Sequence, residues 1–115
     1  MIHEKINYIE MPATNLAGTK QFFIDVFGWS FVDYGPDYAA ITDAGIDGGF
    51  FRSDLVAQTA TGSALVVIKS HDLEASQQRV EQAGGAIVKA IFSFPGGRRF
   101  HFTDPSGNEY AVWSE

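Results

Sequence analysis

The sequence predicts an α+β fold in which one βαβββ unit occurs twice and the two small sheets curve around a cleft. Two amphipathic helix patterns are each preceded by one strand pattern and followed by further strand patterns. The two units lie 57 residues apart, so that together they account for almost all of the 115 residues. We expect a single domain, because half of this chain would bury too little surface to be stable alone.

The first unit begins with a β pattern over residues 5–11, which we expect to end at Pro12. Asn15 is a suitable N-cap for the helix that follows, and apolar residues then recur at helical spacing until Gly28, a suitable C′ residue. Turns at 35–37 and 43–45 separate the later strands, which are expected over residues 29–34, 38–42 and 48–52.

The second unit repeats this plan. An apolar strand covers residues 64–69, Asp72 is placed to cap a helix, and Gly84 ends that helix. The inner face of the helix is expected to consist of Leu73, Ser76, Val80 and Ala83. The remaining strands are expected over residues 86–94, with Ala90 as a candidate break, and over residues 98–103 and 109–113.

A constant shift of 57 residues relates the units position by position. It pairs caps, apolar positions and glycines: Asn15 with Asp72, Met11 with Ile68, Leu16 with Leu73, Gln21 with Gln78, Gly28 with Gly85, and Phe31 with Val88. Chance similarity between two amphipathic helices is the alternative. We expect modules over about residues 1–57 and 58–115, with a polar linker at 58–62. Each helix would cover one sheet face, leaving the free faces to enclose a cleft.

Composition and charge exclude several kinds of partner. Fourteen acidic residues against eight Lys and Arg give a net charge of −6, which disfavours binding to nucleic acid. No apolar run approaches the roughly 20 residues that span a bilayer, and no signal-peptide pattern is visible, so we expect a cytoplasmic protein. The absence of cysteine excludes thiolate metal sites and cysteine nucleophiles.

Three segments resemble one known family. Residues 8–16, 22–29 and 102–110 are similar to its opening strand and helix cap, to its aromatic helix ending Phe-Gly-Trp, and to its Asp-Pro-x-Gly-Asn hairpin. The family is the vicinal-oxygen-chelate group of glyoxalases, bleomycin-resistance proteins and extradiol dioxygenases. The resemblance implies two βαβββ modules around a cleft that holds a small molecule. It also implies a homodimer, because members commonly complete their clefts by pairing, sometimes with exchanged units.

The resemblance implies ligand positions for a metal, one on the first and one on the last strand of each module. In this chain they fall on Tyr8, Leu65, Ala111 and a residue near Gly49. These side chains cannot hold a divalent ion, because such sites need about three imidazole or carboxylate ligands. We therefore predict no family-type metal centre and no cofactor.

Strand alternation places polar side chains beside these positions, on the faces that the resemblance directs into the cleft. Glu10 and His101 are the candidate catalytic residues, since each has the chemistry of a proton acceptor. A relocated metal held by these two residues and Glu109 is the less favoured alternative. An ion pair at the sheet rim for Glu10 and an ordinary sheet histidine for His101 also stay open.

Three further residues are candidate ligand-binding groups. Arg99 offers a cation to an anionic ligand, and Tyr8 and Trp113 offer rings for stacking on a planar one. Core packing is the alternative for Tyr8 and Trp113.

Three functions fit these residues. We favour a binding module that sequesters a small anionic or aromatic compound in a metal-free cleft. The second is an enzyme of the lyase or isomerase type that transfers a proton on a small carbonyl substrate, with Glu10 or His101 as base. The third is a regulatory subunit with a vestigial cleft. The polar residues at the cleft favour the first two.

Overall fold

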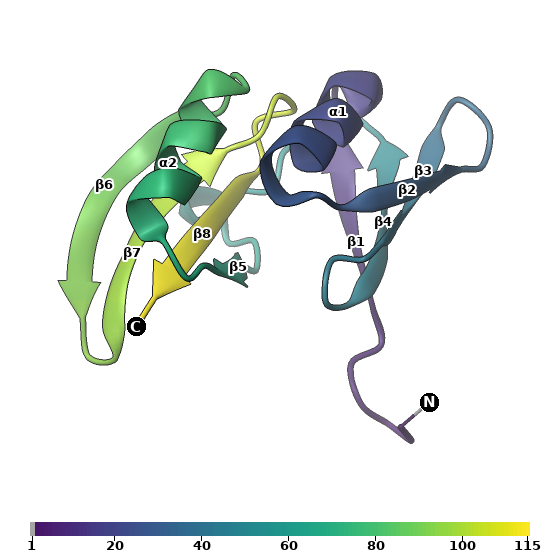
Figure 1. The fold of residues 1–115 in the computed structure, drawn as a ribbon. Coiled ribbons are helices and arrows are strands. Elements are labelled where there is room, and N and C mark those ends of the chain that lie inside the picture. Colours follow the sequence, from purple (N-terminus) through teal and green to yellow (C-terminus); the bar gives the residue numbers. More distant parts are fainter. Residues whose placement is uncertain (1) are drawn as a thin grey trace.

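The computed structural model describes residues 2–115, which form two four-stranded sheets and two α-helices (Figure 1). The α+β architecture predicted from the repeat is therefore confirmed. Among the described residues, no helix is long and apolar enough to cross a membrane.

The first sheet comes from the N-terminal half of the chain. Its unit consists of β1 (Tyr8–Ala13), α1 (Leu16–Phe27), β2 (Ser30–Asp33), β3 (Tyr38–Thr42) and β4 (Asp47–Arg52). The strand order is β1-β4-β3-β2, with β1 parallel to β4 and the other pairs antiparallel.

The second sheet repeats this topology in the C-terminal half. A short 3₁₀ turn, η1, precedes it, and the elements are η1 (Thr59–Thr61), β5 (Val66–Lys69), α2 (Leu73–Gln82), β6 (Ala86–Phe94), β7 (Gly97–Thr103) and β8 (Glu109–Ser114). The order β5-β8-β7-β6, with β5 parallel to β8, is the same arrangement one unit later.

Both helix caps were correctly predicted. The Asn15 side chain accepts a hydrogen bond from the Gly18 N–H, and the Asp72 side chain accepts one from the Ala75 N–H. At the end of α1, Gly28 adopts φ 71°, in the left-handed region that glycine enters at little cost.

Several element limits differ from the sequence-based predictions, among them the start of β5 at Val66 instead of residue 64, and two of the differences have a physical explanation. β1 begins at Tyr8 and continues through Pro12 to Ala13, because β1 is an edge strand and tolerates a residue without an N–H. The constant shift of 57 ends at the helices, because α2 has 10 residues and α1 has 12. The helix-end glycine with positive φ that corresponds to Gly28 is therefore Gly84, not Gly85.

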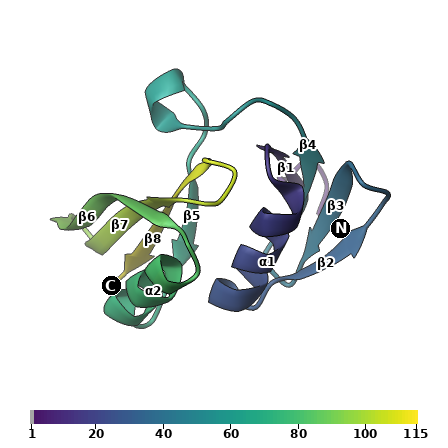
Figure 2. The same cartoon turned by 90° about the horizontal axis from the view of Figure 1, so that it is seen from above.

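One aromatic core joins the two sheets. The Phe23 ring on α1 lies 5.8 Å from Phe50 of the first sheet and 5.1 Å from Tyr110 of the second. Phe22 lies 5.8 Å from Phe102, also of the second sheet. Seen from above, α1 runs between the two sheets (Figure 2). Because the helix-covered faces share this core, the free faces lie on the outside. The expectation from the sequence that the free faces enclose one cleft is therefore wrong for a single chain.

The hairpin between β7 and β8 is organised around a buried carboxyl group. Asp104 accepts hydrogen bonds from the N–H groups of Ser106 and Asn108, at 2.8 and 3.1 Å, and from the Tyr110 hydroxyl at 2.6 Å. Burial raises the pKa of Asp104, although these hydrogen bonds act in the opposite direction. The turn that the sequence predicted is thus held rigid from within.

The same hairpin fastens the second half of the chain to the first. The Asn108 amide donates to the Pro12 carbonyl at 2.6 Å and accepts from the Ala57 N–H at 2.9 Å. The Ser106 hydroxyl lies 2.6 Å from the Thr19 hydroxyl on α1. The two sheets are therefore joined by specific hydrogen bonds as well as by apolar packing.

Candidate functional site

The outer face of the second sheet carries a cation between aromatic rings. Arg99 on β7 pairs with Trp113 on β8 and with Phe92 on β6, so these side chains share one face. The guanidinium carbon lies 5.3 Å from the centroid of Phe92 and 5.5 Å from that of Phe94. Its Nε is buried and has no hydrogen-bond partner among the described residues. A buried donor without a partner costs free energy until an acceptor meets it.

An open pocket of about 620 Å³ lies beside this cation. The pocket is lined by residues of the second unit: Val67, Phe94, Pro95, Gly96, Arg99, Trp113 and Glu115. The nearby Lys69 ammonium lies 5.0 Å over the Trp113 ring but is paired with Glu115 at 2.7 Å. Arg99 therefore supplies the positive charge that is available to a ligand, and the rings supply flat apolar walls.

His101 forms a buried pair with a glutamate on the neighbouring strand. Its Nδ1 lies 2.8 Å from Glu109 Oε2. Its Nε2 is buried and has no partner among the described residues, and the side chain is only 2% exposed. A carboxylate that holds one imidazole nitrogen directs the other, which is how a general base is oriented. The ring of Phe92 lies 5.9 Å from the ring of His101.

Glu109 is also hydrogen-bonded to Thr59 at the start of η1. Its Oε1 accepts hydrogen bonds from the Thr59 N–H at 3.0 Å and from the Thr59 hydroxyl at 2.8 Å. Burial alone would raise the pKa of Glu109, but the hydrogen bonds from His101 and Thr59 outweigh it and lower the pKa. Glu109 therefore stays ionised beside the imidazole.

The outer face of the first sheet carries a different polar group. The hydroxyl oxygens of Tyr8 and Tyr38 lie 2.5 Å apart, and the Tyr38 hydroxyl donates to Glu10 Oε2 at 2.9 Å. Burial is the largest cause that raises the pKa of Tyr38, and the hydrogen bonds with Tyr8 and Glu10 raise it further. Gly49 on β4 provides the space, because a Cβ at this position would overlap the Tyr38 hydroxyl. We refer to Tyr8, Tyr38 and Glu10 as the tyrosine network.

The five predicted site residues are therefore divided between two faces. Arg99, His101 and Trp113 lie on the second sheet, whereas Tyr8 and Glu10 lie on the first. Neither Tyr38 nor Phe92 was predicted from the sequence to belong to a site. The only sequence signal for either was its alternation with apolar neighbours, which does not reveal a hydroxyl network or a cation between rings.

The positions at which metal-using relatives carry ligands do not fit a metal here. In the register of the sheets Gly49 is paired with Glu10, and Ala111 with Val67, so the last strands contribute no donor at these places. Across residues 2–115 no group of three His, Cys, Asp or Glu side chains lies close enough to hold an ion. Glu10 is bound within the tyrosine network and does not join the pair formed by His101 and Glu109. Within one chain, Glu10 therefore does not lie with His101 and Glu109, the three residues weighed as ligands of a relocated metal.

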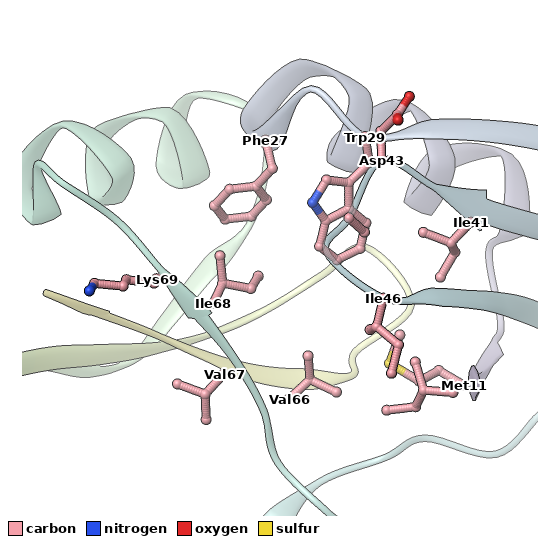
Figure 3. Close-up of a pocket in the computed structure, with 12 residues that line it drawn as sticks. Met11, Phe27, Trp29, Ile41, Asp43, Ile46, Val66, Val67, Ile68 and Lys69 are labelled. Atoms are coloured by element: carbon pink, nitrogen blue, oxygen red, sulfur yellow. The ribbon is translucent and has the colours of Figure 1, made fainter. Parts of the chain in front are cut away.

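A second cavity, of about 360 Å³, lies between the two units (Figure 3). Phe27 and Trp29 form one wall, and Ile9 and Met11 contribute from the face of β1 opposite the tyrosine network. Trp29 is 8% exposed and stacks on Phe23, so it packs between helix and sheet while also lining this cavity. The walls are largely aliphatic and would hold a polar ligand only at the edge.

Comparison with known proteins identifies the family. Residues 5–112 match the family described as the Glyoxalase/Bleomycin resistance protein/Dioxygenase superfamily. The chain belongs to this superfamily. The glyoxalase-superfamily fold also explains the repeated βαβββ topology, which the sequence resemblance had predicted.

Individual relatives are distant. The anthracycline biosynthesis protein DauV of Streptomyces sp. (strain C5) is 27% identical over 124 aligned residues, covering 92% of this chain but only 45% of that protein. This chain therefore spans about half the length of that curated relative.

Two solved structures show the same fold. The fosfomycin resistance protein FosX of Listeria monocytogenes has a TM-score of 0.80 at 14% identity, covering 100% of this chain and 95% of the other. TnmS3, an antibiotic binding protein from Streptomyces sp. CB03234, has a TM-score of 0.70 at 19% identity, covering 99% and 98%. At such identities the likeness concerns the fold alone.

Proposed function

We propose that this glyoxalase-superfamily protein binds a small organic anion with a flat aromatic part, without a metal, on the outer face of the second sheet. The observation that carries the proposal is the environment of Arg99. Its guanidinium lies between two phenylalanine rings, its Nε has no partner among the described residues, and it borders the 620 Å³ pocket. A carboxylate or phenolate oxygen of a ligand would satisfy the buried donor, and the Trp113 ring would stack on the ligand.

The side chains at the family's ligand positions support metal independence. Tyr8, Gly49, Leu65 and Ala111 offer one phenol and no imidazole or carboxylate. The charge that a metal would provide for an anionic ligand is supplied instead by the guanidinium of Arg99. The names of DauV and TnmS3 mention the biosynthesis and the binding of antibiotics, which supports a polycyclic aromatic compound as the ligand class.

Calorimetric titration with 2-naphthoate and its neutral amide tests the proposal. We expect the wild-type protein to bind the carboxylate, and Arg99→Gln to weaken that binding about tenfold or more, since a charged hydrogen bond contributes about 1.5–3 kcal/mol. Binding of 2-naphthamide should change little in the same variant. Arg98→Gln is the matched control, because Arg98 is an exposed arginine paired with Glu74. Equal losses in both variants, or no binding to wild type, would contradict the proposal.

An enzyme that transfers a proton on a small carbonyl compound is the second candidate function. It is favoured by the His101–Glu109 pair, whose free Nε2 has the orientation of a general base. Because this nitrogen is buried, a substrate could reach it only after the surrounding side chains had moved. Glu10, the other base considered, already accepts a hydrogen bond from the Tyr38 hydroxyl.

Solvent exchange measures this activity directly. NMR would follow deuterium incorporation from D₂O into the carbon next to the carbonyl of phenylpyruvate. The enzyme hypothesis requires exchange above the buffer rate that is lost in His101→Gln and reduced in Glu109→Gln. A rate equal to buffer for all three proteins leaves the binding function as the better account.

We also propose that the protein acts as a homodimer in the cytoplasm. The pocket beside Arg99 is open and is walled by the second unit of one chain, and exposed apolar side chains such as Val67 border it. A second copy laid against this face would enclose the ligand. Multi-angle light scattering at micromolar concentration should give twice the monomer mass of 12.6 kDa. A monomer that still binds 2-naphthoate would show that pairing is not required.

A further inference from the structure

The cavity between the two units is enclosed by both halves of the chain (Figure 3). The first unit contributes Met11, Ile41 and Ile46, and the second contributes Val66 and Ile68. Met11 and Ile41 are buried, whereas Ile46 is 39% exposed, so the cavity reaches from the apolar core to the surface. Its volume of about 360 Å³ is within the range of about 300–1,000 Å³ that is usual for sites of small molecules.

Trp29 brings a hydrogen-bond donor without a partner into the wall of this cavity. Its indole Nε1 makes no hydrogen bond to any of the described residues. Figure 3 shows this nitrogen on the side of the ring that faces Phe27 and Ile68. The ring is held in place, because it stacks on Phe23 with the centroids 4.4 Å apart and an interplanar angle of 7°. The direction of the donor is therefore fixed before a ligand arrives, which lowers the cost of binding.

The two charged side chains at the cavity do not favour a charged ligand. The Lys69 ammonium is paired with Glu115 at 2.7 Å. The carboxylate of Asp43 points away from Ile41 and Ile46 in Figure 3. Apart from these two and Trp29, the lining side chains are apolar. A charge placed among them would lose its water without gaining a counter-charge, so the walls suit a neutral compound.

We propose that this cavity is a second binding site, for a small neutral apolar compound that carries one hydrogen-bond acceptor, such as a ketone or an ester. The indole N–H of Trp29 donates to the acceptor, and the apolar remainder packs against Ile46, Val66 and Ile68. This site goes beyond the anion site at Arg99. Val66 and Ile68 alternate with Val67 along β5, so the two sites lie on opposite faces of that strand.

Acetophenone and ethylbenzene test the site, because they differ only in a carbonyl group against a methylene group. The chain has two tryptophans, so ¹⁵N-resolved NMR shows two indole N–H signals, and Trp113→Phe assigns that of Trp29. We expect acetophenone to shift the Trp29 signal and to bind about fivefold more tightly than ethylbenzene, since it alone gives the donor a partner. A Trp29 signal that acetophenone leaves in place, or equal affinities, would overturn the proposal.

Three variants separate the cavity from general apolar contact. Ile46→Phe places a larger side chain at the opening and should weaken acetophenone at least about fivefold. Ile24→Phe, the same exchange at a 43% exposed position on α1 that does not line the cavity, is the matched control and should bind as the wild type does. Trp29→Phe keeps an aromatic ring and removes the donor, so both compounds should bind equally.

A loss in Ile24→Phe as large as in Ile46→Phe, or a preference for acetophenone that persists in Trp29→Phe, would contradict the assignment. If Trp29→Phe does not fold, the indole signal of the wild-type protein decides alone.

The outcome is independent of the function proposed above. The 2-naphthoate titration reports on Arg99, and Ile46→Phe should leave it unchanged, while Arg99→Gln should leave acetophenone binding unchanged. If acetophenone fails to bind while 2-naphthoate binds, this inference is wrong and the anion site stands; the reverse result removes the anion site alone.

Discussion

Arg99 and His101 lie two residues apart on β7, and each has a buried nitrogen without a partner in the described chain. Alternation along the strand was enough to predict that they share a face. Their environments were not predictable, because Phe92 and Phe94 come from β6, whose pairing with β7 shifts register on both sides of Lys89. A sequence pattern cannot say which residues an irregular strand will bring opposite a given side chain.

At the residue scale, the pair of His101 and Glu109 predicts a pH-dependent stability. Because the pKa of Glu109 is lowered in the folded protein, its contribution to stability is present above the ordinary glutamate pKa near 4.5 and is lost as the pH falls through the lowered value. Glu109→Gln should therefore lower the melting temperature at pH 7 and have a much smaller effect at pH 3. Thermal unfolding of both proteins at each pH measures this, with Glu81→Gln on an exposed helix position as control. A deficit that is equal at the two pH values would refute it.

At the element scale, the helices were the most predictable parts of the chain. Asn15 and Asp72 cap them as expected, since a short polar side chain before an apolar helical pattern has one favourable local use. Strand limits were less predictable. β1 contains Pro12, and whether a proline ends a strand depends on its being at the edge of the sheet, which is a property of the whole sheet.

The end of α1 provides a prediction at this scale. Gly28→Ala places a Cβ in the left-handed region and should lower the free energy of unfolding by about 1–2 kcal/mol. Gly28→Asn should lose less, because asparagine tolerates this conformation better. Urea unfolding of the variants and the wild type measures both values. Equal stability of Gly28→Ala and wild type would show that this cap contributes nothing.

At the scale of the whole molecule, the Asp-Pro-Ser-Gly-Asn hairpin is the joint between the halves. The sequence identified it as a turn and as a mark of the family, but its contacts with β1 and α1 span more than 80 residues of chain. Such contacts depend on how the two units dock. Because this docking cannot be read from the sequence, all site residues were predicted to lie in one cleft. In the structure the shared aromatic core directs the free faces outward.

The contacts of this hairpin predict the effect of a single substitution. Asn108→Ala leaves the Ala57 N–H without its acceptor and the Pro12 carbonyl without its donor, which should destabilise the fold by about 2–4 kcal/mol. Asn7→Ala, at an exposed position, is the control. Chemical unfolding followed by far-UV circular dichroism and by tryptophan fluorescence should show this loss in Asn108→Ala alone. An unchanged midpoint would mean that apolar packing by itself joins the units.

We propose that this chain recognises its ligand with a guanidinium instead of a metal. The direct test is to titrate 2-naphthoate into chelator-treated protein and into the same protein reloaded with Zn²⁺, Ni²⁺, Mn²⁺ or Fe²⁺. We predict the same affinity in every preparation and its loss in Arg99→Gln. Binding that appears only in a metal-loaded sample, together with one tightly held equivalent of that metal, would contradict the claim.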